Sequence, residues 1–169
     1  MNPLARLLLR TWLTIAAIDF TFASSLSVFA YRSTFARLWQ GVAATLLGPS
    51  AFQGGTRTIL IGIAMHLGVA LAWSTVFLIL ALMWPALRRA IATPAGVLGV
   101  AALYGPAIWL FMSAVVVASL TGKPPTYAFR WWVQLVGHIV FVALPIVWTV
   151  SRGVDRAPAG APRTAPAVA

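Results

Sequence analysis

The chain of 169 residues contains no cysteine, which excludes disulfides, thiolate metal sites, iron–sulfur clusters and cysteine nucleophiles. Acidic residues are almost as scarce, with two Asp and Glu against 12 Lys and Arg and a net charge of +10. Charged residues make up 8% of the chain and apolar residues 61%, whereas soluble domains carry about 25% charged residues. So few charged residues cannot cover the solvent-exposed surface of a soluble globular protein. The composition therefore excludes a soluble enzyme, a disordered chain and a fibrous repeat, and indicates an integral membrane protein.

Long apolar runs are what the sequence has instead. A bilayer core is about 30 Å thick, and a helix needs about 20 apolar residues to cross it. Polar or helix-breaking segments separate four such runs, so we predict an all-α fold, an integral membrane four-helix bundle. A domain over residues 1–152 is followed at 153–169 by an Ala/Pro-rich segment, expected to be a disordered cytoplasmic tail. The expected spans cover residues 8–31, 58–84, 95–120 and 129–150.

A fifth, shorter helix is predicted over residues 34–47, in the first connecting segment. Its apolar residues recur at helical spacing, and it is too short to cross a membrane. We expect it to lie in the interface with Trp39 at headgroup level, to dip into the bilayer as a re-entrant segment, or to cap the end of the bundle. The apolar residues are Phe35, Leu38, Trp39, Val42 and Leu46.

Cations between the spans predict the orientation in a bacterial cytoplasmic (inner) membrane, because basic loops stay on the cytoplasmic side. Short groups of cations fit anionic lipid headgroups better than nucleic acid, which needs a continuous basic surface. The larger group of cations lies on the same side as both termini, so we predict that both termini are cytoplasmic. The larger group is Arg6, Arg10, Arg88, Arg89, Arg152, Arg156 and Arg163, and the smaller group is Arg32, Arg37, Arg57, Lys123 and Arg130.

Residues 1–30 are predicted to form a retained helix rather than a cleaved signal peptide.

Ionisable residues within the expected spans are candidates for function, because lipid offers them no hydrogen-bond partners. They are Asp19 in the first span, His66 in the second and His138 in the fourth, with Gln134 one turn before His138. Estimated depths place all three ionisable groups where they can meet in the outer half of the bundle. We therefore predict a buried polar cluster of Asp19, His66, His138 and Gln134.

Small or weakly polar residues form one seam along each span, and such seams allow helices to approach closely. Each seam is expected to face the bundle interior, and three of the four carry the ionisable residues. The seams are Ala16, Asp19, Ala23, Ser27 and Ala30; Gly62, His66, Ala70 and Ser74; Gly99, Ala102, Pro106, Trp109 and Ser113; and Gln134, His138, Val142 and Pro145.

Several interpretations of the cluster stay open. It is a hydrogen-bonded structural group that fixes helix register, a proton or ion path, or a metal or haem site with His66 and His138 as axial ligands. In the fourth interpretation, Asp19 bonds only to Ser or Thr and the histidines lie apart. Space for a haem ring is expected beside Gly62, Ala70 and Gly137. Zinc takes three or four protein ligands, and the spans offer two histidines and one aspartate, so zinc is the less favoured metal.

Proline inside a span marks a second candidate feature. Gly105 with Pro106, and Pro145 in the fourth span, are candidate hinges, with a static packing kink as the alternative.

The segment Leu47-Gly48-Pro49-Ser50-Ala51-Phe52-Gln53-Gly54-Gly55, together with Tyr104-Gly105 and Gly137-His138, resembles small four-helix inner-membrane proteins of bacteria. The resemblance implies that architecture and transfers no catalytic residue. We expect a non-enzymatic structural or partner subunit, working as a homo-oligomer or with another membrane protein, and no cofactor. The alternatives are a small transporter or proton-conducting element using Asp19, His66 and His138, and a bis-histidine haem-binding electron carrier.

Overall fold

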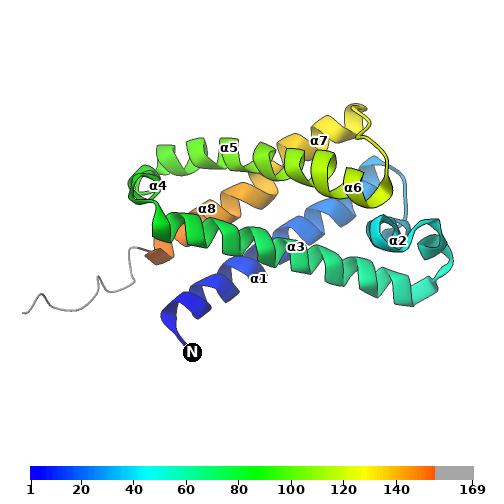
Figure 1. Ribbon diagram of the computed structural model, residues 1–169, viewed down its shortest axis with the longest axis horizontal. Helices are drawn as coiled ribbons and strands as arrows, with labels where there is room; N and C mark the ends of the chain where they lie inside the picture. The colour runs from blue at the N-terminus through cyan, green and yellow to red at the C-terminus, as the bar shows by residue number, and fades with distance from the viewer. Residues whose placement is uncertain (155–169) are drawn as a thin grey trace, which may run out of the picture.

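The structure, a computed structural model, describes residues 1–154, and these residues form helices and no strand (Figure 1). The prediction of an all-α fold is confirmed for this part of the chain. Four helical runs are long and apolar enough to cross a membrane. Each has at least 26 residues, a length of roughly 39 Å, which exceeds the thickness of about 30 Å of a bilayer core. The runs are Pro3–Ala30, Gly55–Met83, Pro94–Thr121 and Phe129–Val154.

Three of the four runs include a π-helical segment, a feature that the sequence does not predict. The first run is α1 (Pro3–Ser25) with η1 (Leu26–Ala30), and the second is α3 (Gly55–Met83) alone. The third run is α5 (Pro94–Phe111), η3 (Met112–Val117) and α6 (Ala118–Thr121). The fourth run is α7 (Phe129–Gly137), η4 (His138–Ala143) and α8 (Leu144–Val154). A π segment rotates the faces of the helix on either side of it and often occurs at functional sites.

The connecting segments contain the short helices α2 (Phe35–Leu47), η2 (Pro49–Gln53) and α4 (Pro85–Ala90). The ends of α2 follow local chemistry. The Thr34 hydroxyl accepts a hydrogen bond of 3.1 Å from the backbone N–H of Arg37, a typical N-cap. The helix ends at Gly48, where a φ of 74° requires a residue without a Cβ.

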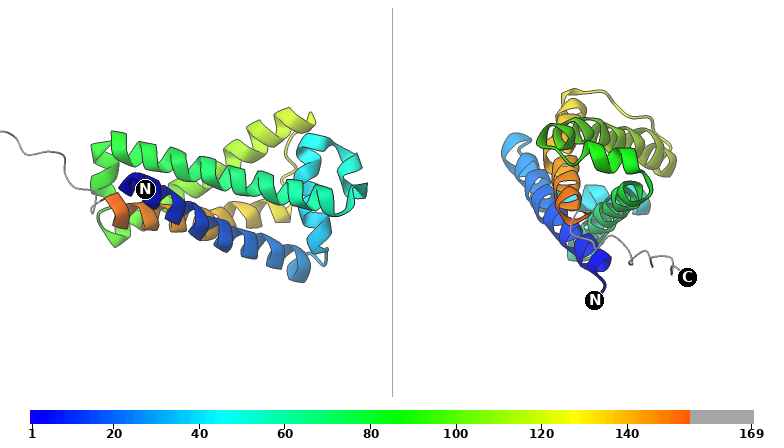
Figure 2. Two further views of the ribbon diagram at one scale, coloured as in Figure 1. Left: turned by 90° about the horizontal axis from the view of Figure 1, so that it is seen from below. Right: turned by 90° about the vertical axis from the view of Figure 1, so that its left-hand side faces the viewer.

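The fourth run packs against all three of the others, and α2 lies across one end of the bundle (Figure 2). The N-terminus, α4 and the end of α8 gather at the opposite end (Figures 1 and 2). This position matches the expected cap over the bundle end, and a location in a membrane interface stays a prediction. Trp39 is only 1% exposed, because α2 crosses the helix ends and its side chain packs inward.

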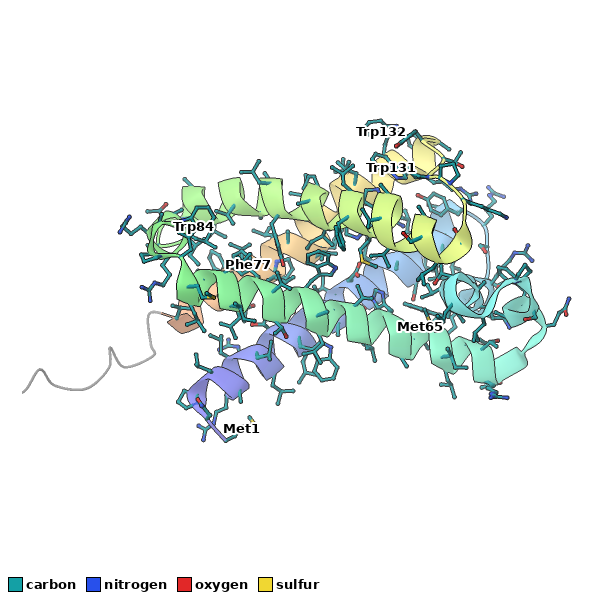
Figure 3. All side chains as sticks on the ribbon, viewed as in Figure 1. Met1, Met65, Phe77, Trp84, Trp131 and Trp132 are labelled. Carbon is teal, nitrogen blue, oxygen red and sulfur yellow. The ribbon has the colours of Figure 1, made fainter. Side chains whose placement is uncertain are left out.

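The half of the bundle nearest α4 is a closely packed apolar core. Phe77 of α3, 1% exposed, extends toward α5 and packs on Tyr104 with ring centroids 5.0 Å apart (Figure 3). Ile146, Val147 and Val150 of α8 are completely buried beside it. Burial of such side chains is worth roughly 1.5–3 kcal/mol each relative to exposure. This half therefore supports the geometry of the other half, which contains the polar residues.

The expected seam holds on α3, where Gly62, Ala70 and Ser74 are buried. On the first run Ala16 and Ser27 are buried, but Ala30 at the end of the expected seam is exposed. The seam expected on the third run is wrong over its first half, since Gly99 and Ala102 are exposed. The buried residues there are Val97, Ala101, Gly105 and Ile108. Apolar residues occur on every face of α5, so small residues were a poor guide to the interior face.

The end of the described chain also differs from expectation, because α8 continues to Val154, inside the expected tail of 153–169. The rest of that predicted disordered tail, residues 155–169, lies outside the described residues.

Candidate functional site

A cavity of about 350 Å³ occupies the half of the bundle nearest α2. All four long helical runs and α2 contribute to its wall, and Met65 of α3, labelled in Figure 3, marks its position. Asp19, His66, Gln134 and His138 all line this one cavity. The rest of the wall is mainly apolar and includes the indoles of Trp39, Trp73 and Trp109. The structure thus brings the four predicted site residues to a shared space, although each is half-buried rather than fully enclosed.

Asp19 and His66 are in direct contact between α1 and α3. Asp19 Oδ2 lies 3.4 Å from His66 Nε2, and the two side chains are 14% and 17% exposed. The approach does not satisfy hydrogen-bond geometry, since Nε2 is buried without a hydrogen-bond partner. It is a contact at the distance of an ion pair.

Trp39 of α2 holds the imidazole of His66 in place. The two rings meet edge to face with centroids 5.1 Å apart, and Phe20 of α1 stacks on the same indole at 4.8 Å. The α2 helix can approach this closely because Gly62, one turn before His66, has no side chain. A Cβ on Gly62 would collide with the backbone carbonyl of Trp39.

His138 is held separately, by its own helix. Its Nδ1 lies 2.7 Å from the backbone carbonyl oxygen of Gln134. A carbonyl only accepts, so Nδ1 carries the hydrogen and Nε2 of the neutral ring is left as an acceptor. The indole of Trp109 packs on the ring at 4.8 Å. Within residues 1–154, no hydrogen bond or ion pair joins His138 to Asp19 or His66. The predicted cluster is therefore one contacting pair and a third ring across a common cavity.

Gly105 and Pro106, expected as a hinge, lie at a close contact between helices. A Cβ on Gly105 would be 2.7 Å from the backbone of both His138 and Ile139. Pro145 is the second residue of α8, in the first turn after η4 ends at Ala143. This packing fits the static alternative, and movement at these residues stays a prediction.

The room expected for a haem ring is filled beside two of the three small residues, Gly62 and Gly137, whereas Ala70 lines the cavity. The space beside Gly62 is taken by the backbone of α2, and a Cβ on Gly137 would be 2.6 Å from the ring of Phe22. The expectation of free space at these glycines is therefore wrong, because other segments of the chain use them for close packing. In the described part of the chain, no group of three or more His, Cys, Asp or Glu is placed to hold a metal ion. Haem ligation by His66 and His138 would need only two ligands and stays a prediction.

Sequence reasoning missed the three indoles as part of the site. Trp39 was assigned to the interface and Trp73 to no role, while Trp109 was placed on an inward seam without a function. For Trp73 the sequence does contain a signal, because it follows His66 by two turns on the same helix. The position of Trp109 depends on the structure, where neighbouring Gly105 packs against the backbone of His138.

Comparisons with known proteins add no constraint. No protein-family model, curated protein or solved structure matches the chain.

Proposed function

We propose that the chain is a multi-pass protein of a bacterial inner membrane with both termini in the cytoplasm. Four apolar helical runs support this proposal. Their outer faces also carry large apolar side chains, such as Leu60, Leu103 and Val136 at 60%, 76% and 57% exposure. Exposed apolar side chains on each of these runs suit contact with lipid. Cations at the ends of the runs would then contact anionic headgroups.

We further propose that the protein is non-enzymatic and that Asp19, His66, His138 and Gln134 form its polar centre. The observation that carries this proposal is the 3.4 Å contact of Asp19 with His66 in the wall of the cavity. In an apolar interior, such a contact fixes how two helices meet, because neither group has a better partner in lipid. The protein would act as a structural or partner subunit, either as a homo-oligomer or with another membrane protein.

A small transporter or proton-conducting element is the second candidate function. It is favoured by the cavity, which places a carboxyl group and two imidazoles in one space between all four runs. Such groups are the usual members of proton relays in membranes. Proton flux into proteoliposomes distinguishes the candidates. A relay predicts that Asp19→Asn abolishes flux above empty vesicles, and a structural centre predicts no such flux in either protein.

The absence of cysteine makes the orientation testable with single-cysteine variants. Ser50 in η2 and Ala92 between α4 and α5 are both exposed and lie at opposite ends of the bundle. We expect a membrane-impermeant maleimide to label Ser50→Cys in intact cells, and Ala92→Cys only after permeabilisation. The opposite pattern would invert the proposed topology. Labelling of both in intact cells, or extraction of the protein by alkaline carbonate, would overturn the multi-pass assignment.

A further inference from the structure

We propose that the cavity binds a small organic cation with an apolar body, with Asp19 as the counter-charge and the indoles of Trp39, Trp73 and Trp109 as the walls. The inference deepens the proposed polar centre and rests on the role of Asp19 there. It does not depend on which way the protein is oriented in a membrane.

Charge is the first argument. The chain as a whole is strongly basic, yet no Lys or Arg lines the cavity, and Asp19 provides the one formal charge among its lining residues. Apart from the contact with His66, no hydrogen bond or ion pair to Asp19 occurs within residues 1–154. A carboxylate in an apolar wall favours a cation, and the same wall disfavours an anion.

The composition of the wall separates an organic cation from a metal ion. Calcium takes six to eight oxygen ligands, and magnesium requires nearly ideal octahedral geometry. Besides Asp19, the side-chain oxygens in this wall belong to Thr45 and Gln134. The remaining lining is aliphatic or aromatic apart from two imidazoles, and such a surface suits an apolar ligand body.

Aromatic rings give the second, independent argument. Three indoles line the cavity on three different elements, α2, α3 and α5. The face of Trp attracts cations more strongly than that of Tyr or Phe, and cages of such rings recognise quaternary ammonium groups. Trp39 also touches the imidazole that contacts Asp19, so an aromatic wall and the carboxylate lie in the same part of the cavity.

Size limits the ligand. A volume of about 350 Å³ is near the lower end of small-molecule sites, which range over roughly 300–1,000 Å³. A single aromatic ring with a trimethylammonium group is a suitable probe. Phenyltrimethylammonium and tert-butylbenzene form a matched pair, because they share one shape and differ in a positive nitrogen replacing a carbon.

The test is equilibrium dialysis of each probe against the full chain in lipid nanodiscs, with empty nanodiscs subtracted to remove partition into lipid. We expect the cation to bind at least about tenfold more tightly than the neutral probe, the factor that corresponds to about 1.4 kcal/mol. Equal affinities would overturn the proposal, since they would indicate an apolar cavity without charge selection. Binding of neither probe above the empty nanodiscs would overturn it as well.

Variants then locate the charge. Asp19→Asn keeps the side-chain size and is expected to remove the preference for the cation while affinity for tert-butylbenzene stays the same. Asp155→Asn removes the chain's other acidic residue and is expected to bind both probes as the wild type does. If Asp19→Asn retains the preference, or Asp155→Asn loses it, the site is not at Asp19.

A third variant keeps the test decisive if Asp19→Asn does not fold. Trp109→Leu removes one indole from the wall, and we expect it to weaken the cation several-fold more than the neutral probe. Equal weakening of both probes would contradict the aromatic part of the proposal.

Failure of these binding tests leaves the maleimide labelling of Ser50→Cys and Ala92→Cys unaffected, so the loss of the cation site and the loss of the membrane assignment are separate results.

Discussion

The backbone carbonyl of Trp39 in α2 lies so close to Gly62 in α3 that no Cβ fits between them. One turn further along α3, the indole of the same Trp39 packs on His66, and His66 contacts Asp19 of α1. A single glycine thus determines where α2 rests, and α2 in turn supplies one wall of the cavity. The short amphipathic helix belongs to the site as well as to the end of the bundle.

Gly62→Ala is therefore expected to destabilise the protein. The added methyl group meets backbone, which cannot rotate away, so α2 must shift and Trp39 must leave His66. Overpacking of this kind costs about 1–3 kcal/mol. Thermal unfolding in detergent, followed by circular dichroism, measures the effect.

Gly68→Ala is the matched control, because Gly68 lies on the same helix with nothing within 4 Å of a new Cβ. It is expected to be neutral or to stabilise by up to about 1 kcal/mol through helix propensity. Equal unfolding temperatures for the two variants would show that α2 does not rest on Gly62.

Gly105 makes the corresponding contact between the third and fourth runs. Gly105→Ala would place a methyl group 2.7 Å from the backbone of His138 and Ile139. We expect a loss of stability in the same range of about 1–3 kcal/mol, together with a displaced His138. Gly99→Ala, six residues earlier on the exposed face of α5 with nothing within 4 Å of a new Cβ, is expected to leave the monomer unchanged. A destabilised Gly99→Ala would instead indicate that this face packs against another chain.

Glycines such as Gly62 also illustrate what the sequence could and could not predict. Length and hydropathy predict the four runs, because about 20 consecutive apolar residues are the length that a helix needs to cross a bilayer. Spacing of apolar residues predicts the helix over 34–47, which the structure places at Phe35–Leu47. Neither signal says which segment fills the space beside a glycine. Room beside Gly62 and Gly137 was expected for a ligand, and Trp39 and Phe22 occupy it.

The candidate site was predictable in its residue types more than in its contacts. Scarcity of charge singled out Asp19, and the two histidines followed as ionisable groups at similar depth. Asp19 contacts His66, while Nδ1 of His138 bonds to the backbone carbonyl of Gln134. The fourth run also contains the π-helical segment η4, which begins at His138. Periodicity at 100° per residue cannot reveal such turns, because they change the phase of the helix within a span.

Tyr104 connects the third run to the second through its hydroxyl, which donates a hydrogen bond of 2.8 Å to the backbone carbonyl of Trp73. Tyr104→Phe removes this bond and is expected to cost about 0.5–1.5 kcal/mol. Tyr127→Phe removes the same atom from a residue that is 62% exposed and is expected to change nothing. Chemical denaturation of both variants in the same detergent checks the difference. If Tyr104→Phe unfolds with the wild type, the hydroxyl does not connect the two runs.

The contact of Asp19 with His66 can be measured directly by a double-mutant cycle with Asp19→Asn and His66→Gln. Residues in contact typically couple by about 0.5–3 kcal/mol, whereas distant residues add within about 0.5 kcal/mol. We expect coupling within the contact range for this pair, because each single variant leaves a polar group without its partner in an apolar wall. The parallel cycle of Asp19→Asn with His138→Gln is expected to give a smaller coupling, since those residues share the cavity and no contact joins them within residues 1–154. Additive free energies in the first cycle would remove the pair as a structural element, and a larger coupling in the second would place the carboxylate beside His138 instead.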